Sequence, residues 1–327
     1  MWTDMASASL VFLILYFIVF VILNFLLFTG RIKFRSRWAV IYFHVAVRLA
    51  SQACGLAFGI LVWKNTQVLT AYFILGAEGY FTLVLCTARF LISWHNHHFG
   101  DSWLEHRRDR RVKLPWYQHV KLSFGISSIK ERPFNMVEWY LIAANALIIA
   151  GGSLNSSAAF DDTLSATKRN SLDNTAKIMR TIGQSIFLAI NVGLFVCIIV
   201  TVQQCRRVKQ GSRWFGHPTL LLLILTWPFL ATRGIFGVLQ SAMPEFSYFN
   251  TDNFTQTGFT GIFLTEEFCM ATMPEWVSCA LLLGTYLTSR GDPPKPPIEE
   301  VLQLRGLPAS IYGHSPAGKR AQSENGY

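Results

Sequence analysis

Seven blocks of apolar residues, each about 20 residues long and almost free of charge, constrain this chain more than any other feature of its sequence. A helix of that length crosses the roughly 30 Å hydrocarbon core of a bilayer. Backbone groups in lipid find no water, so each block must satisfy its own hydrogen bonds, which a helix does within one segment. The blocks run over residues 8–28, 39–62, 67–93, 136–152, 178–202, 218–241 and 264–287.

The composition agrees with this pattern. Only 15% of the 327 residues are charged and 51% are hydrophobic, whereas about 25% are charged in an average soluble domain. This argues against a soluble enzyme, a disordered protein or a coiled coil. The predicted fold class is all-α, a polytopic membrane protein with one seven-helix domain over residues 1–290. The block at 136–152 is the weakest, because it reaches full crossing length only with Glu138 at one end and Ser153 and Leu154 at the other.

The distribution of lysine and arginine predicts the orientation, because cytoplasmic loops hold an excess of these residues. Three connectors and the C-terminal tail share one side and hold 21 of the 29 cations. The other side holds four, which are Lys64, Lys168, Arg169 and Lys177. We therefore predict that the N-terminus lies outside and the C-terminus in the cytoplasm. Two N-x-Ser/Thr sequons, at Asn155 and Asn253, fall in predicted outer loops and are candidates for glycosylation.

The formal net charge of +10 is concentrated in the cytoplasmic connectors, where anionic inner-leaflet lipids attract it. We therefore predict membrane lipids as partners and no nucleic acid. The connector over residues 94–135 is basic and rich in histidine, and its segment 114–129 suits either a position in the membrane interface or an ordinary loop. The proline-rich tail over residues 291–327 is predicted to be disordered.

Four charged side chains stand well inside the blocks, where charge is costly and therefore faces the bundle interior, pairs, or lines a path. They are Arg48, Glu78, Arg233 and Glu275. One interpretation is a polar cavity or switch near the midplane, and the other is ion pairs that lock helix packing. Arg89 and Arg180 lie near block ends, where a long side chain reaches the interface.

Small residues and prolines mark further details of the blocks. Gly55 and Gly59 form a small-xxx-small pair, which is typical of close helix packing. Pro228 and Pro274 predict kinks in the sixth and seventh blocks, because proline lacks the N–H of the helical ladder.

A histidine cluster follows the third block, and it includes His95, His97 and His98. Membrane di-iron enzymes use such clusters, but they need more histidines in repeated boxes on two connectors. We therefore treat these three as weak metal candidates beside a solvated or lipid-facing cluster. The prediction is a protein that is not an enzyme and has no cofactor.

Short motifs carry a resemblance to a known family. They are Arg37-Trp38 with Arg48, the run Pro228-Phe229-Leu230-Ala231-Thr232-Arg233, Phe249-Asn250, and Met270 with Met273-Pro274-Glu275. They resemble a family of uncharacterised fungal seven-span membrane proteins, which is itself distantly similar to fungal lipid-translocating exporters of the aminocholesterol-resistance type. The likeness covers residues 9–93 and 178–287, and the connector at 94–135 and Gly234-Ile235-Phe236 depart from it. The resemblance implies the topology and a fungal source, and it assigns no chemistry.

Three functions remain open at this point. The first is a protein of the plasma membrane or an endomembrane that senses or translocates a small amphipathic molecule or lipid through the polar cavity. The alternative is a seven-helix receptor that couples to cytoplasmic partners through its basic connectors. The third and weakest is a membrane enzyme that depends on the histidine cluster and a metal.

Overall fold

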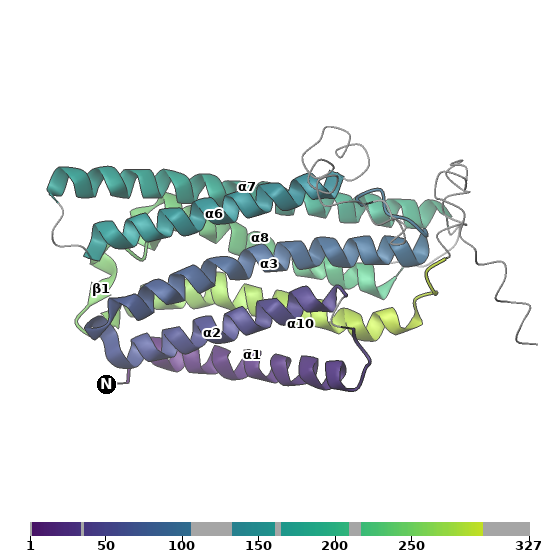
Figure 1. Cartoon of the computed structure of the whole chain (residues 1–327), viewed down its shortest axis with the longest axis horizontal. Helices are drawn as coiled ribbons and strands as arrows, with labels where there is room; N and C mark the ends of the chain where they lie inside the picture. The colour runs from purple at the N-terminus through teal and green to yellow at the C-terminus, as the bar shows by residue number, and fades with distance from the viewer. Residues whose placement is uncertain (1, 34–35, 106–132, 161–164, 209–216, 297–327) are drawn as a thin grey trace, which may run out of the picture. The chain divides into compact units, whose positions relative to one another are not determined.

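The computed structural model describes residues 2–33, 36–105, 133–160, 165–208 and 217–296 (Figure 1). Within these residues, seven helices are long and apolar enough to cross a membrane, which confirms the predicted number of spans. The chain divides into two compact units. The first, here called the helical unit, comprises Met1–Leu91 and Val137–Gly291, and the second, here called the connector unit, comprises Ile92–Met136 and Asp292–Tyr327.

Six of the spans are continuous helices. They are α1 (Asp4–Phe28), α2 (Trp38–Leu61), α3 (Thr66–His98), α6 (Pro133–Phe160), α7 (Ala166–Val208) and α8 (Pro218–Ala242). The seventh span consists of α9 (Gly261–Glu267), the π-helical turn η4 (Phe268–Thr272) and α10 (Met273–Thr288). Three short 3-10 turns follow helices: η1 (Val62–Lys64) after α2, η2 (Pro244–Phe246) after α8 and η5 (Ser289–Gly291) after α10. A fourth, η3 (Thr251–Asn253), precedes the β-hairpin.

Glycines allow α1 and α2 to lie close together along their length (Figure 1). A Cβ atom on Gly59 would lie 2.5 Å from the backbone nitrogen of Ala6, and one on Gly55 would lie 2.6 Å from the Ser9 hydroxyl. The small-xxx-small pair therefore packs against a helix of the same chain. Thr3 secures the contact, because its hydroxyl caps the first turn of α1 and donates to the Gly59 carbonyl at 2.8 Å.

The helix α7 is longer than the predicted span at 178–202, because it begins at Ala166. Hydropathy detects only the part of a helix that suits lipid, and the polar residues before Ile178 form helical backbone bonds equally well. Close packing joins α7 to α6 near this end. A Cβ on Gly183 would lie 2.7 Å from the Ala144 carbonyl, and one on Gly151 would lie 2.9 Å from the Ala176 carbonyl.

The seventh span changes its hydrogen-bond pattern in the middle. The N–H of Met273 donates to the carbonyl of Phe268, five residues earlier, which closes a π-helical turn. Pro274 follows in the first turn of α10 and has no N–H to donate to the preceding turn. The change of pattern at the predicted kink thus lies just before Pro274, whereas Pro228 lies inside the continuous helix α8.

An aromatic cluster covers the end of the helical unit where α3 and α7 begin, here called the hairpin end. The strands β1 (Phe254–Thr255) and β2 (Gly258–Phe259) pair there as a short antiparallel hairpin. The Phe259 ring lies 5.9 Å from Phe58 and 5.8 Å from Trp63, and the Trp63 indole donates to the Thr255 carbonyl at 2.7 Å. The hairpin is therefore held against the C-terminal end of α2.

The connector unit is described in part, over residues 92–105, 133–136 and 292–296. The backbone N–H of Phe134 donates to the Leu104 carbonyl at 3.0 Å, which brings the two ends of the long connector together. The predicted interfacial segment at 114–129 and the tail from residue 297 onward lie outside the described residues.

Candidate functional site

An ion cluster of three side chains occupies the interior of the helical unit. Glu275, in the first turn of α10, is 0% exposed. Its Oε2 lies 2.6 Å from Nη2 of Arg48 on α2, and its Oε1 accepts a hydrogen bond of 2.5 Å from Nε of Arg233 on α8. The structure therefore brings together three of the four charged residues that the sequence singles out.

Neighbouring helices supply rings and space for this cluster. The Arg48 guanidinium lies over the Tyr16 ring at 6.0 Å, and that of Arg233 lies over the Tyr80 ring at 5.6 Å. Gly79 on α3 leaves room for the carboxylate, because a Cβ there would lie 2.6 Å from Glu275 Oε2. The cluster thus depends on contacts from five helices of the unit.

The fourth charged residue, Glu78, has a different partner. The Asn145 amide on α6 donates to Glu78 Oε1 at 2.6 Å, and Glu78 is half-buried. Its neighbour in sequence, Gly79, faces the ion cluster, and successive residues of a helix point in different directions.

A cavity lies beside the ion cluster, toward the hairpin end. The volume that the centres of water molecules can occupy in it is about 60 Å³. Three arginines line it, Arg48, Arg180 and Arg233, together with the carboxylate of Glu267. All four side chains are buried. Within the lining, three arginines face a single carboxylate; Glu275 lies behind the lining, and the exposed Asp173 acts on Arg180 from outside it.

Arg180 is a member of this site that sequence reasoning placed elsewhere. It was expected to reach the membrane interface, yet it is only 8% exposed. Its guanidinium lies over the Phe249 ring at 5.5 Å. In the amide orientation that satisfies both atoms, the Asn155 oxygen accepts from Arg180 Nη1 at 3.0 Å and its nitrogen donates to Asp173 at 2.6 Å.

Glu267, at the end of α9, is the residue that sequence reasoning missed. It is 6% exposed, and Gln240 on α8 donates to its Oε2 at 2.9 Å. Burial, followed by the negative charge of Glu267, raises the pKa of the Tyr248 phenol well above its usual range, so Tyr248 stays a donor beside this carboxylate. Glu267 lies near the start of the predicted block 264–287. It is missed when only the charged residues deep inside the blocks are considered.

Three polar atoms of the cavity-lining residues lack a hydrogen-bond partner among the described residues. They are Nε of Arg48, Nη1 of Arg233 and Oε1 of Gln184, and all three side chains are buried. The last two lie against Gly237, where a Cβ would come within 2.5 Å of Gln184 Oε1 and 3.0 Å of Arg233 Nη1. An unsatisfied buried donor costs about 1 to 3 kcal/mol. Water or a ligand in the cavity can therefore form hydrogen bonds with these unpaired donors and this acceptor.

Part of the remaining lining of the cavity is apolar and half-buried. It comes from α3, through Ile74 and Ala77, and from α6, through Ile149. The α6 helix also exposes Trp139, Tyr140 and Ile142. The cavity thus has a cationic side and an apolar side, as a site for an amphipathic molecule requires.

The two sequon asparagines are both engaged in the folded chain. Nδ2 of Asn253 donates to the carbonyls of Glu245 and Ser247, each at 2.9 Å. Asn155 is buried and bonds to Arg180 and Asp173, as described above. Glycosylation at these positions stays a prediction.

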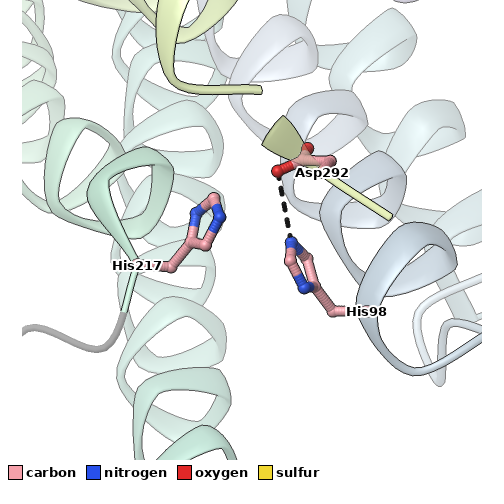
Figure 2. Close-up of side chains that lie close together, drawn as sticks. All are labelled: His98, His217 and Asp292. Atoms are coloured by element: carbon pink, nitrogen blue, oxygen red, sulfur yellow. Dashed lines mark hydrogen bonds and ion pairs between the residues drawn. The ribbon is translucent and has the colours of Figure 1, made fainter. Parts of the chain in front are cut away.

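Each of the three candidate metal histidines has a different partner among the described residues of the connector unit. His95 Nδ1 lies 2.9 Å from the Ser102 hydroxyl, and His97 Nδ1 lies 2.9 Å from the Pro293 carbonyl. His98 Nε2 lies 3.3 Å from Asp292 Oδ1, as the dashed line in Figure 2 shows. Figure 2 also labels His217, which caps α8 and belongs to the helical unit.

Comparison with known proteins identifies a family and no activity. No curated protein and no solved structure matches the chain. A family model described as "Domain of unknown function (DUF7702)" matches residues 118–291, which is more than half of the chain. The matched residues include Arg180, Arg233, Glu267 and Glu275 but not Arg48. Since the match covers more than half of the chain, this membrane protein belongs to the DUF7702 family.

Proposed function

We propose that this protein binds the anionic headgroup of a small amphipathic molecule or lipid in the cavity at the hairpin end, and thereby senses or translocates that molecule. The observation that carries the proposal is the convergence of three buried arginines on one cavity: Arg48, Arg180 and Arg233. Among the lining residues these arginines face one carboxylate, Glu267, and a buried cation favours an anion as its partner.

The chemistry of the lining indicates the class of headgroup. Guanidinium groups bind carboxylate, sulfonate and phosphate oxygens through paired, charge-assisted hydrogen bonds. The unpartnered Nη1 of Arg233 offers such a donor, and Oε1 of Gln184 accepts from a hydroxyl on the same ligand. The cavity holds a few waters by volume, since each needs about 10 to 15 Å³ on this measure. It therefore suits a headgroup, with the rest of the ligand outside.

The apolar side of the cavity suits the tail of such a molecule. Ile74 and Ala77 on α3 and Ile149 on α6 are half-buried, and α6 presents further large apolar side chains to its surroundings. An acyl or alkyl chain can leave the cationic site along this surface into lipid. The resemblance of residues 9–93 and 178–287 to proteins that are distantly similar to fungal lipid exporters supports a lipid-like ligand and a fungal source.

The cation distribution supports an orientation for the site. If the N-terminus lies outside, the hairpin end faces outward and the ligand enters from the outer leaflet of the plasma membrane or the lumenal leaflet of an endomembrane. A tag on the C-terminus should become accessible once the plasma membrane alone is permeabilised, and any glycan should appear at Asn155 or Asn253. A C-terminal tag that stays protected, or Asn155 accessible from the cytoplasm, would overturn this orientation.

The binding proposal is tested with the full chain in lipid nanodiscs. Octane-1-sulfonate serves as the probe, and octanol and octyltrimethylammonium serve as controls with the same tail. We expect the sulfonate alone to raise the midpoint of thermal unfolding in a concentration-dependent way, because a ligand that binds the native state stabilises it. Equal effects of all three compounds would indicate tail partitioning and contradict the proposal.

A pair of variants assigns the effect to the cavity. Arg180→Gln removes one lining cation and should lower the affinity for the sulfonate by about tenfold, the value of one charge-assisted hydrogen bond. Arg89→Gln removes one cation from α3 outside the lining, where Arg89 pairs with Glu138, and should leave the affinity unchanged. Flux of the probe into proteoliposomes then separates translocation from sensing, and nucleotide exchange on a co-expressed G protein tests the receptor alternative.

A further inference from the structure

The two buried carboxylates of the seventh span are held in different ways. Glu275 forms ion pairs with Arg48 and Arg233. Glu267 accepts from the neutral amide of Gln240 and interacts with the phenol of Tyr248. Among the described residues, Glu267 forms no ion pair. It is therefore a buried carboxylate whose charge is met only by neutral donors at close range.

Charged and titratable groups from several elements face Glu267. Arg48 on α2, Arg180 on α7 and Arg233 on α8 act on it at longer range, and all three line the same cavity. Tyr72 on α3 and Tyr248 in the loop before the hairpin add phenols. The positive charge that balances Glu267 is thus the positive charge that a ligand anion would use.

We propose that Glu267 takes up a proton when an anionic headgroup binds, so that ligand binding is coupled to protonation. This inference rests on the proposed function. A bound anion and the Glu267 carboxylate would share one small, buried cavity, and two negative charges there repel each other strongly. Addition of one proton from solvent to a carboxylate oxygen of Glu267 gives a neutral acid and removes the repulsion. The three arginines then no longer face an ionised Glu267, although Arg48 and Arg233 stay paired with Glu275.

Linkage fixes the direction of the effect. If binding takes up a proton, then protonation strengthens binding by the same factor. The affinity is therefore highest at low pH and falls as the pH rises. Should the protein translocate its ligand, a proton would travel with each anion.

The test measures proton uptake directly. Octane-1-sulfonate stays ionised across the working pH range, so any proton taken up belongs to the protein. Titration calorimetry of the full chain in nanodiscs, in two buffers of different ionisation enthalpy, gives the number of protons per bound probe. We expect about one proton for the wild type near neutral pH, and about tenfold weaker binding per pH unit where coupling is complete.

Three variants assign the proton to one residue. Glu267→Gln mimics the protonated acid and should bind the probe without proton uptake and without pH dependence. Glu78→Gln changes a carboxylate that does not line the cavity, and it should keep the wild-type proton count. Gln240→Leu removes a donor to the ionised carboxylate and should move the fall in affinity to higher pH.

The outcomes separate the two proposals. If the wild type binds the probe with no proton uptake, or if Glu267→Gln still takes up a proton, the coupling is wrong while the anion site stands. If Glu267→Gln does not fold, an unmoved pH profile in Gln240→Leu overturns the assignment to Glu267. If no sulfonate binds to the wild type at any pH, the proposed function itself fails.

Discussion

The ion cluster and the cavity wall lie side by side in the helical unit, and each contains a buried carboxylate. The two carboxylates differ in their partners. In the cluster, both oxygens of Glu275 meet arginines at 2.6 and 2.5 Å. In the wall, Glu267 meets an amide and a phenol, and the nearby arginines face open volume. Arg48 and Arg233 belong to both regions, so Arg180 is the cation that the cavity adds to those of the ion cluster.

This difference shows that charged side chains within membrane spans can have different roles. Both carboxylates are buried, so burial alone does not distinguish them. What distinguishes them is ion pairing: two arginines pair with Glu275, and among the described residues none pairs with Glu267. A buried ion pair resists change, because loss of one member strands the other in a low dielectric. A buried charge outside an ion pair can exchange its partner for water, a proton or a ligand.

The largest expected effect comes from breaking the ion cluster. Glu275→Gln strands two buried arginines and should lower the free energy of unfolding by about 3 to 5 kcal/mol. Glu267→Gln keeps its neutral donors and should cost about 1 kcal/mol or less. Denaturant unfolding of both variants in the same micelles measures the contrast. Equal losses would show that the two carboxylates do not differ in the way that their contacts indicate.

A charge reversal sharpens the account of the cluster. Arg233→Glu and Glu275→Arg should each abolish most folded protein, and the double variant should recover part of it, with a coupling free energy of about 2 kcal/mol. Recovery stays partial because Arg48 also binds Glu275. Yield of monodisperse protein after extraction reports the result. A double variant no better than the worse single one would show that Arg233 and Glu275 are not partners.

Two glycines on α3 test how closely the cluster is packed. Gly79→Ala places a Cβ 2.6 Å from Glu275 Oε2 and 2.9 Å from Arg48 Cδ, and it should cost about 1 to 3 kcal/mol of unfolding free energy. Gly76→Ala serves as the matched control, since its Cβ comes no closer than 3.7 Å to Arg48 Nη1. The control should be neutral or stabilising, because alanine favours helix over glycine. A destabilised control would point to a general intolerance of α3.

A glycine on α8 tests the open region in the same way. Gly237→Ala pushes on Gln184 Oε1 and Arg233 Nη1, which are ends of flexible side chains beside a cavity. Stability should therefore change by less than about 1 kcal/mol, while sulfonate affinity falls by about tenfold. Gly193→Ala on α7 has nothing within 4 Å of its Cβ and provides the control. Unchanged affinity in Gly237→Ala would remove these two atoms from the binding site.

The smallest effect concerns a pair that resembles the cluster only in its residue types. Arg89 pairs with Glu138, but their side chains are 35% and 25% exposed. Screening weakens such a pair, so Arg89→Gln should cost less than about 1 kcal/mol. The same unfolding measurement checks this value. A loss as large as that of Glu275→Gln would mean that exposure does not govern the strength of these pairs.

Hydropathy predicts the seven spans because the bilayer imposes one length and one chemistry on every crossing helix. It does not find where a helix continues beyond lipid, and so it places the start of the fifth span at Ile178 although α7 begins at Ala166. Arg180 then appears to lie near a helix end. In the structure it lies well inside a helix and faces Phe249 and Asn155.

The cavity is harder to predict than the ion cluster. Arg48, Arg233 and Glu275 are conspicuous because they sit deep in apolar blocks, and opposite charges there must meet. Glu267 is recognisable only through Tyr248, which comes from a loop that folds against the bundle, and through Gln240 on another helix. Such contacts depend on tertiary packing, and a single sequence carries no periodic signal for them.

The π-helical turn at Phe268–Thr272 fixes the rotational phase between the two halves of the last span. It is equivalent to one residue inserted into an α-helix, and one residue corresponds to a rotation of about 100°. Deletion of a single residue in this turn would restore a regular ladder and still leave a span of sufficient length. It would also swing Glu267 away from Gln240 and Tyr248 while Glu275 kept its arginines. The direction in which the Glu267 side chain points is therefore determined by the number of residues in this turn, independently of their hydrophobicity.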